Sequence, residues 1–576
     1  MIDRGVRFRV AVCAAFLMLC MVGLASRLTG LHLRREGPAD PAPDRVRPVD
    51  KSFSDQRGSI FDRHGPGNIL AIDVMRQDLC ADPSLIVKSN RVREVAALLA
   101  EPLKVSADVL AEKINSPERR YTRLARFLDD DQVRQIESNK VQGLFFQDTR
   151  LRNYPQRSSM CHVLGFVNEE RLGRAGVEQF ADKYLRGSRG LIESEENAVH
   201  QEIYDRRKID IRPLEGGNVT LTLDQNVQSI VEKALDEVMA EHRAKGAWAI
   251  VQKVRTGEIL AMVSRPAYDL NEYDKAAARP ERMLNRAIGL VYEPGSTMKA
   301  VPIAAALNEG VVTPETRFDC EHGSWTCNGR ALRDYHPEGV LTVADGLQKS
   351  SNILTAKVAI QLGEQRLYRY LRAFGIGDRL GVDLPGEERG LLSPVAGWSK
   401  ISITRLPIGQ GVAVTALQML GAYCTIANNG QLMRPYVVSR ITSSDGALLF
   451  EQRPEQLSRP ISAETATTMR RLLARVTEEG GTGKRAKIDG YEVAGKTGTA
   501  QKAVAGGYSS TAYVASFVGF LPAESPEIGV IVVVDEPQPF HTGGVVAGPT
   551  FGKIVGQAVR YLDIPPPDMG AVAQAE

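Results

Sequence analysis

Residues 291–300 read VYEPGSTMKA, a stretch in which Ser296 and Lys299 form a Ser-x-x-Lys pattern. On a helix, two residues three positions apart share one face, about one turn from each other. Pro294-Gly295, just before the serine, is turn chemistry that can begin such a helix, and the apolar residues that follow can bury it. The pattern predicts a serine nucleophile and a lysine base at the start of a buried helix.

The lysine of this pattern can act as a base only when its pKa is lowered, because an ammonium group has no free electron pair. Burial and a neighbouring cation both lower the pKa of a lysine. Lys496, far along the chain in AGKTGTA, is a candidate for that cation. We therefore expect Lys299 and Lys496 to meet in the folded protein.

A second motif, Ser350-Ser351-Asn352, lies in LQKSSN. The hydroxyl of Ser350 can relay a proton, and the side chain of Asn352 can hold an amide of the substrate. Serine and asparagine also favour the first positions of helices, so the same three residues could form an ordinary helix cap. Read alone, the motif predicts either a catalytic element or a helix start.

The third motif is Lys496-Thr497-Gly498-Thr499. A glycine in a strand leaves space where a substrate pairs with the strand edge, which gives Gly498 a role. Backbone N–H groups of Ser296 and Thr499 are suited to form an oxyanion hole. Alone, this motif could be an ordinary turn. The three motifs in this order, each beside an apolar segment, indicate acyl transfer through a serine ester.

The composition is that of a globular protein with more than one domain. The chain has 576 residues, 43% hydrophobic and 24% charged, and such a length favours two or more domains. Its net charge of +3 is nearly neutral for this size, and no basic aromatic motif stands out, which argues against a nucleic-acid partner. Acyl transfer through a serine needs no metal and no cofactor, and we expect neither.

The N-terminal segment is suited to cross a membrane. Residues 10–26, VAVCAAFLMLCMVGLAS, carry no charge and follow three arginines within residues 1–9. Their length is sufficient for one span when the helix continues to residue 33, so we expect a membrane anchor at 10–33 after a short cytoplasmic segment at 1–9. Small residues at 23–25 leave a cleaved signal peptide as the alternative.

The rest of the chain divides by composition. Residues 34–55 are rich in proline and charge and indicate a linker, and Gly216-Gly217 marks a boundary between two larger parts. Alternating apolar residues predict strands early in the first part, and residues 90–142 read as helical. We expect a non-catalytic pedestal domain at 56–215, a catalytic domain at 216–565 and a disordered tail at 566–576.

The second part combines strands with long helices. NVTLTL at 218–223 predicts a strand, and residues 225–242 place apolar side chains at helical spacing on one face. AWAIVQKV and EILAMVS flank a turn at 255–257 and predict a hairpin, and two more buried strands follow at 513–522 and 527–537. The predicted fold class is α+β and multidomain, with a membrane helix, a mixed α/β pedestal and a central antiparallel sheet flanked by helices, beside which the third motif lies.

Two cysteines outside the apolar span leave a question open. Cys320 and Cys327 flank EHGSWT and can form a disulfide in an oxidising compartment or remain as two thiols, and the sequence favours neither. His322 lies near them, but a zinc site is less favoured because no Cys-x-x-Cys pair accompanies it.

With these residues, the chain resembles the class B penicillin-binding proteins, the monofunctional D,D-transpeptidases that cross-link peptidoglycan. RGSIFDRHG at 57–65 is similar to the motif that opens the family's pedestal, and RNYPQRSSMCH and AGVEQFADKYLRG resemble two later pedestal motifs. His64 replaces the usual asparagine, and Arg157 stands where a glycine is common. From residue 221 onward the resemblance to the transpeptidase domain is continuous.

The resemblance implies a role for each motif residue. It implies a serine acyl-enzyme formed on the D-Ala-D-Ala end of a peptidoglycan stem peptide, with release of D-Ala. β-Lactams are implied as covalent inhibitors. The implied catalytic residues are Ser296, Lys299, Ser350 and Asn352, and the implied substrate-binding and oxyanion residues are Lys496, Thr497, Gly498 and Thr499.

The resemblance also implies a cellular role. LCADPSLI and LQKSSN are more similar to the division-specific FtsI type than to the elongation type. That type implies a single-pass protein of the cytoplasmic membrane with a periplasmic catalytic domain, and partners that include an FtsW-type glycosyltransferase and divisome proteins.

Three alternatives remain, which are an elongation-type transpeptidase, a serine β-lactamase and a non-catalytic β-lactam receptor. A β-lactamase is disfavoured because no Glu-x-x-Leu-Asn-like segment follows Ser350-Ser351-Asn352. A receptor is disfavoured because residues 1–9, ahead of the expected span, are too few for a signalling domain.

Overall fold

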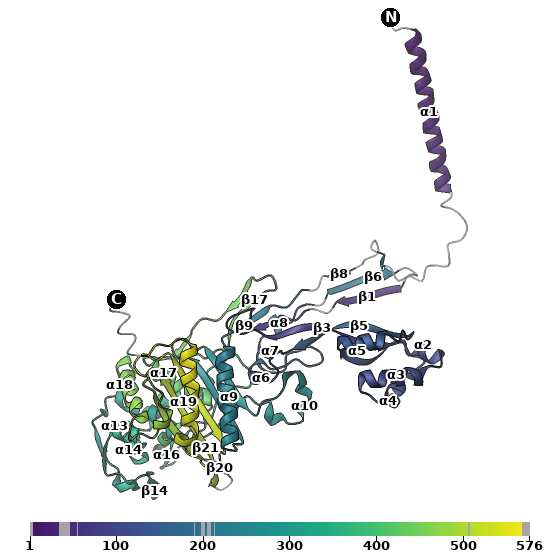
Figure 1. Ribbon diagram of the computed structural model, residues 1–576. Coiled ribbons are helices and arrows are strands. Elements are labelled where there is room, and N and C mark those ends of the chain that lie inside the picture. The colour runs from purple at the N-terminus through teal and green to yellow at the C-terminus, as the bar shows by residue number, and fades with distance from the viewer. Residues whose placement is uncertain are drawn as a thin grey trace. The chain divides into compact units, whose positions relative to one another are not determined.

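The computed structural model of the chain contains two compact units, whose elements Figure 1 labels. The first unit comprises residues 1–53 and 189–213, and the second comprises residues 54–188 and 214–576. All residues of the expected tail at 566–576 except the first lie outside the described residues. The structure describes residues 4–33, 47–53, 56–188, 190–196, 202–203, 209–211, 214–504 and 507–566.

The first unit begins with helix α1, Arg4–Leu33. Its window Val12–Thr29 is long and apolar enough to cross a membrane, which holds for no other helix in the described part of the chain. The Thr29 hydroxyl donates a hydrogen bond to the Ala25 carbonyl at 2.6 Å, so this polar group is satisfied within the helix. The helix covers the expected anchor at 10–33, and its length and composition suit an anchor and a signal sequence alike.

The same unit contains a small antiparallel sheet. Strand β6 (Gly190–Glu196) pairs with β1 (Arg47–Phe53), β7 (Glu202–Ile203) and β8 (Ile209–Ile211). Strand β1 lies within the range 34–55, where the composition indicates a linker. Its partner β6 lies far along the chain, and such a pairing depends on tertiary contacts that local composition does not record.

The second unit begins with a mixed sheet of seven strands in the order β18-β17-β9-β2-β3-β4, with β5 also paired to β3. Strands β2 and β9 are parallel, and the other neighbours are antiparallel. Because β9, β17 and β18 come from the catalytic part of the sequence, one sheet joins it to the pedestal. The strands are β2 (Ile60–Phe61), β3 (Ile69–Ala81), β4 (Thr122–Leu128), β5 (Leu144–Asn153), β9 (Asn218–Leu221), β17 (Val438–Thr442) and β18 (Leu448–Glu451).

Four short helices pack against β3, β4 and β5 and enclose a separate apolar core. Asp82, Ser106 and Asp129 accept hydrogen bonds from backbone N–H groups at the first turns of α2, α4 and α5. The expectation that residues 90–142 are helical is wrong at β4, where pairing with β3 overrides the local pattern. The helices are α2 (Pro83–Lys88), α3 (Val92–Leu103), α4 (Ala107–Ile114) and α5 (Asp130–Glu137).

A buried ion-pair network connects the three pedestal motifs. The Glu178 carboxylate accepts hydrogen bonds from Arg57 Nε and Arg152 Nε, both at 2.7 Å. Arg57 also pairs with Asp182 at 2.7 Å, and Arg152 pairs with Asp73 at 3.4 Å. Because Arg57 is 2% exposed and Glu178 is 0% exposed, these charges are neutralised inside the protein rather than by water.

The catalytic part is built on a five-stranded sheet in the order β11-β10-β22-β21-β20, in which every neighbouring pair is antiparallel. The prediction of a central antiparallel sheet is confirmed, and the third motif lies on β20 at one edge of it. The strands are β10 (Gly246–Lys253), β11 (Ile259–Arg265), β20 (Ala494–Val504), β21 (Gly507–Leu521) and β22 (Ile528–Asp535).

Helices cover both faces of this sheet. Alternate residues of β10 point to opposite faces, and they belong to two different apolar cores. Helices α9 (Gln225–Glu241) and α19 (Gly543–Tyr561) pack against each other and against β11 and β21, and enclose one core (Figure 1). Helix α17 (Ala416–Ala427) packs on β21 and β22 in the other core, together with α12 (Ala300–Asn308) and α14 (Asn352–Leu362). The helices that follow the first two motifs therefore lie in the larger core.

Shorter elements complete the second unit, and among them β13 and β14 form a hairpin. They are α6 (Cys161–Leu164), α7 (Gly176–Phe180), α8 (Asp182–Leu185), α10 (Tyr273–Ala277), α11 (Arg286–Gly289), α13 (Val343–Gln348), α15 (Glu364–Ala373), α16 (Ser402–Arg405), α18 (Ala463–Ala474), β12 (Arg317–Asp319), β13 (Ser324–Cys327), β14 (Arg330–Arg333), β15 (Val340–Thr342), β16 (Leu432–Met433) and β19 (Gln456–Ser458).

Candidate active site

Ser296 lies in a tight 3₁₀ turn, Gly295–Lys299, directly before helix α12. Gly295 has a φ of +57°, a left-handed conformation that favours glycine. A Cβ atom at Gly295 would lie 2.9 Å from the Thr499 carbonyl oxygen, and Gly295 N donates a hydrogen bond to the Gly409 carbonyl at 3.3 Å. The backbone before the serine is therefore packed directly against the third motif.

Lys299 is fully buried, and its ammonium group contacts the second motif. Nζ donates hydrogen bonds to the Ser350 carbonyl at 2.5 Å and to the Ser350 hydroxyl at 3.1 Å. Ser296 and Lys299 are both among the described residues, and no hydrogen bond joins their side chains. Burial lowers the pKa of Lys299 to about 7, and the negative charge of Asp334 opposes this effect. A lysine with this pKa can take up a proton at neutral pH.

Lys496 is the second buried lysine of the site. Burial lowers the pKa of Lys496 well below its ordinary value, and the charge of Lys299 lowers it further. Its Nζ lies 3.4 Å from the hydroxyl oxygens of Thr482 and Thr497, which are long contacts for hydrogen bonds. The structure thus brings the two lysines together and leaves the Lys496 donors weakly engaged.

The second motif combines a helix cap with two residues of the cavity. Ser350 has a φ of +64°, a left-handed conformation that is uncommon for a residue with a side chain. Ser351 precedes α14 and its hydroxyl accepts a hydrogen bond from Leu354 N at 3.1 Å, as a helix cap does. Ser350 and Asn352 line the cavity beside Ser296. The helix-cap interpretation therefore holds for Ser351 alone.

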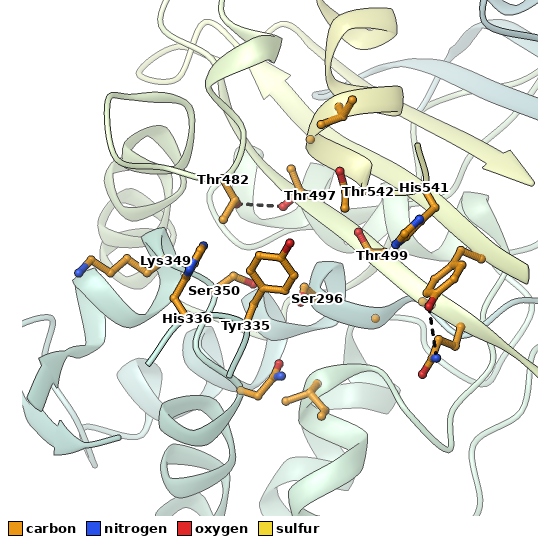
Figure 2. A pocket seen from close by; sticks show the side chains of 18 of the residues that line it. Ser296, Tyr335, His336, Lys349, Ser350, Thr482, Thr497, Thr499, His541 and Thr542 are labelled. Atoms are coloured by element: carbon orange, nitrogen blue, oxygen red, sulfur yellow. Dashed lines mark hydrogen bonds between the residues drawn. The ribbon is translucent and has the colours of Figure 1, made fainter. Parts of the chain in front are cut away.

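One cavity of about 630 Å³ connects the three motifs. Lys299 and Lys496 are both fully buried beneath its surface. Figure 2 shows the side chains that reach this cavity from separate segments of the chain. The predicted residues that line it are Ser296, Ser350, Asn352, Thr497 and Thr499.

Gly498 has a different role from the one expected. A Cβ atom at this position would lie 2.3 Å from Ser516 Oγ, 2.9 Å from the Pro294 carbonyl oxygen and 2.9 Å from Thr297 Cγ2. These atoms belong to β21 and to the turn that carries Ser296. The absent side chain therefore lets β20 approach the serine turn, rather than leaving space for a substrate at the strand edge.

Several residues of the cavity were not indicated by the sequence. Thr482 places its hydroxyl oxygen 2.9 Å from that of Thr497, next to Lys496. The rings of Tyr513 and His541 stack with centroids 4.0 Å apart, and both line the cavity. No short motif contains these residues, since they reach the cavity from segments that are distant in sequence.

Glu293 is the one carboxylate among the described residues that line the cavity. Its Oε1 accepts hydrogen bonds from Gly411 N at 2.8 Å and from the Tyr508 hydroxyl at 3.2 Å. Burial raises the pKa of Glu293, against the effect of these two donors. This residue is therefore the group to examine as a base for hydrolysis.

Cys320 and Cys327 are both free thiols in the structure. Cys320 is buried, and its sulfur lies 3.5 Å from Ser351 Oγ. Cys327 ends the extended strand β13, in which each residue advances the chain by about 3.3 Å. The strand therefore leads Cys327 away from Cys320, and the two thiols do not form a disulfide.

Two family profiles match the chain, one after the other. The profile described as Penicillin-binding Protein dimerisation domain matches residues 54–221. The profile described as Penicillin binding protein transpeptidase domain matches residues 247–556. The chain belongs to the class B penicillin-binding proteins.

Relatives of this penicillin-binding protein are similar to it over most of their length. The probable peptidoglycan D,D-transpeptidase PenA of Neisseria meningitidis is 32% identical over 515 residues, which cover 88% of this chain and 85% of the relative. The peptidoglycan D,D-transpeptidase FtsI of Escherichia coli is 32% identical over 575 residues, which cover 97% of this chain and 93% of the relative.

A solved structure supports the fold of this penicillin-binding protein. Penicillin binding protein 3 of Mycobacterium tuberculosis in complex with aztreonam is similar with a TM-score of 0.68 and 28% sequence identity. The similarity covers 90% of this chain and 98% of that chain. The bound aztreonam shows that a relative with this fold accepts a β-lactam.

Proposed function

We propose that this penicillin-binding protein is a peptidoglycan D,D-transpeptidase of the FtsI type, which cross-links stem peptides in septal wall synthesis. The observation that carries the chemistry is the buried Lys299 amine, 3.1 Å from the Ser350 hydroxyl and in the same turn as Ser296. The names of PenA and FtsI support the reaction and the substrate. The septal role is supported by the resemblance to the FtsI type.

The first chemical step forms an ester on Ser296. The neutral amine of Lys299 takes the proton of the Ser296 hydroxyl, whose oxygen then bonds to the carbonyl carbon of the penultimate D-Ala. Backbone N–H groups of Ser296 and Thr499 stabilise the oxyanion. The bond from that carbon to the nitrogen of the terminal D-Ala breaks. The nitrogen receives the proton of Lys299 through the Ser350 hydroxyl, and D-Ala leaves.

The second step transfers the acyl group to an amine. The amine of a neighbouring stem peptide attacks the ester carbonyl and passes one proton to Lys299. That proton moves to the Ser296 oxygen as the ester bond breaks. A new peptide bond forms, and the serine and the lysine return to their starting states, so the cycle takes up and releases no net proton.

The terminal carboxylate of the donor has a matching site. The buried amine of Lys496 makes long contacts only, and the hydroxyls of Thr482 and Thr497 lie next to it at the cavity. Strand β20 lies at the edge of its sheet, where an extended peptide can pair with free backbone groups. These features support recognition of a peptide that ends in a carboxylate.

We also propose a membrane location and a partner. Helix α1 is suited to anchor the chain in the cytoplasmic membrane, with the catalytic domain on the periplasmic side where peptidoglycan lies. The two matched profiles describe dimerisation and transpeptidation, so the glycan strands would come from another enzyme. An FtsW-type glycosyltransferase and divisome proteins are the proposed partners.

A donor–acceptor assay tests the reaction. A stem pentapeptide that ends in D-Ala-D-Ala is incubated with the full chain and an isotopically labelled D-amino acid as the acceptor. We expect D-Ala release together with the labelled exchange product, and neither with Ser296→Ala. Release of D-Ala without any exchange product would make the chain a carboxypeptidase. No release under conditions where penicillin still acylates the chain would exclude this donor.

A further inference from the structure

Asp334 follows strand β14 and lies beside the start of helix α14. Its Oδ2 accepts a hydrogen bond from the Ser351 hydroxyl at 2.6 Å, and its Oδ1 accepts from Asn352 N at 2.5 Å and from Ile353 N at 3.0 Å. The first amides of a helix have no partner within the helix, and the helix dipole favours a negative charge there. One carboxylate therefore holds Ser351, Asn352 and Ile353, the end of the second motif and the first turn of α14.

The residue before Asp334 orients the side chain of Asn352. The carbonyl of Arg333 accepts a hydrogen bond from Asn352 Nδ2 at 2.7 Å. Because a backbone carbonyl can only accept, this contact fixes the amide nitrogen toward Arg333. Asp334 N in turn donates to the Gly323 carbonyl at 3.1 Å. The segment 333–334 is thus tied to its surroundings while it holds Asn352 at the cavity.

Ser350 is the single residue between two fixed segments. Ser350 N donates to the Leu347 carbonyl at 3.2 Å and Ser351 N donates to the Gly346 carbonyl at 2.8 Å, which ends helix α13. On the other side, Asp334 holds the residues that begin α14. A left-handed conformation in a residue with a side chain persists only where the surroundings hold it. The contacts of Asp334 therefore help to keep both oxygens of Ser350 at the Lys299 amine.

Two charged side chains in the described part of the chain act on the Lys299 amine. The negative charge of Asp334 opposes the lowering of the Lys299 pKa by burial. The other charge coupled to Lys299 is that of Lys496, from β20. The Cys320 thiol, 3.5 Å from Ser351 Oγ, stays neutral near pH 7 because burial raises its pKa. Among the described residues, Asp334 is thus the acidic group whose charge acts on Lys299.

We propose that Asp334 is a positioning residue for acylation, which holds the Ser350 hydroxyl at Lys299 and the Asn352 amide at the cavity, and whose charge faces the base. This inference rests on the proposed function, since Asp334 acts through residues to which that function gives roles. The carboxylate itself contacts neither the nucleophile nor the substrate.

The test is the rate of acylation by a fluorescent penicillin, measured from about pH 5.5 to 9, with the full chain in detergent. Asp334→Asn keeps the shape and removes the charge. We expect a rate lower by on the order of 10- to 100-fold, as for small displacements of reacting groups. We also expect the acid limb of the profile to move to lower pH, because the ammonium form of Lys299 loses a favourable charge.

Two variants separate geometry from charge. Asp334→Glu keeps the charge in a longer side chain, so the rate should fall while the acid limb stays at its native pH. Asp345→Asn is the matched control, because Asp345 bonds Thr342 and Arg475 and does not contact the second motif. Its rate and its acid limb should both equal those of the unchanged chain.

The inference is overturned if folded Asp334→Asn protein acylates within twofold of the native rate, or slows equally at every pH with its acid limb unmoved. If Asp334→Asn does not fold, Ser351→Ala removes the 2.6 Å hydrogen bond and leaves the charge in place. A slower rate with an unmoved acid limb then supports the inference, and a native rate refutes it. Labelling that survives in Ser296→Ala would refute the proposed function instead.

Discussion

Lys299 Nζ lies 2.5 Å from the carbonyl oxygen of Ser350 and 3.1 Å from its hydroxyl, so one amine joins the first motif to the second. The carbonyl can only accept a hydrogen bond, whereas the hydroxyl can accept a proton and pass one on. The left-handed backbone of Ser350 turns both oxygens toward the lysine. In the proposed mechanism, this residue completes the path for the proton.

Acylation should depend on pH through the state of Lys299. Because the neutral amine is the proposed base and burial lowers the pKa of Lys299 to about 7, the acylation rate should rise with pH and level off above about 8. A pH series with a fluorescent penicillin measures this limb. Lys299→Arg keeps a charged group at every pH, so it should lose on the order of 10²–10⁴-fold in rate. An acid limb near pH 5 would assign the base to a carboxylate.

Lys299 should also reduce the stability of the fold. Folding lowers the pKa of Lys299 from 10.5 to about 7, so the unfolded chain binds more protons between these values and stability rises with pH across that window. Lys299→Met removes the buried amine and should stabilise the chain at pH 7 by about 1–4 kcal/mol while abolishing acylation. Calorimetry measures the change in melting temperature.

The matched control for Lys299→Met is Lys553→Met. The side chain of Lys553 is 52% exposed, and its pair with Glu237 lies at the surface. A change there should alter stability by less than about 0.5 kcal/mol. A lower melting temperature for Lys299→Met would instead mean that the folded protein stabilises the charged lysine.

Gly498→Ala should move strand β20 away from the turn that carries Ser296. The added methyl group would meet Ser516 Oγ and the Pro294 carbonyl, so β20 would have to move away from the serine turn. We expect a lower melting temperature and a lower acylation rate, measured on the same preparation. Gly67→Ala is the control, because a Cβ atom at Gly67 has no neighbour within 4 Å. Native behaviour of Gly498→Ala would show that the strand has room to adjust.

The sequence alone predicts those residues whose chemistry requires a fixed residue type at a short spacing. Ser296 and Lys299 are separated by one turn, and the apolar runs of β10 and β22 mark buried strands without further information. The contact that gives Gly498 its role, with Pro294 and Ser516, joins three segments and leaves no local pattern. The same holds for Asp334, which is one acidic residue among many until the fold brings it to α14.

In the pedestal too, contacts between distant segments could not be predicted from the sequence. RGSIFDRHG, RNYPQRSSMCH and AGVEQFADKYLRG were visible as three separate motifs, but only the structure shows that Arg57, Arg152 and Glu178 form one buried network. The local pattern predicts helix where the structure has strand β4, because β4 pairs with β3, which precedes it by many residues. Pairings over such distances are decided by tertiary contacts rather than by local propensity.

Arg57→Ala should destabilise the pedestal without changing the chemistry. It removes one of the two arginines that pair with the buried Glu178 and the nearer of the two that pair with Asp182, and breaking a buried pair costs about 3–5 kcal/mol. We expect a lower melting temperature and an unchanged acylation rate per folded molecule. Arg126→Ala breaks a surface pair with Glu169 and should cost less than about 1 kcal/mol. Equal effects of the two changes would show that the network adds little.

Glu293 should not act as a base for water in the acyl-enzyme. Its Oε1 is engaged by Gly411 N and the Tyr508 hydroxyl, which hold the carboxylate in place. Glu293→Gln should therefore leave the slow decay of the penicilloyl ester unchanged, as followed by intact mass after free drug is removed. A tenfold slower decay in Glu293→Gln would identify Glu293 as the hydrolytic base.

The most direct test of the site is to expose the full chain to a labelled penicillin, map the modified peptide and follow the adduct over time by mass spectrometry. We predict one adduct, on Ser296, that decays over many minutes to hours, because Glu293, the one carboxylate among the described residues that line the cavity, is held by Gly411 N and the Tyr508 hydroxyl. An adduct on another serine, or the turnover of several penicillin molecules per second, would contradict a transpeptidase acting through Ser296.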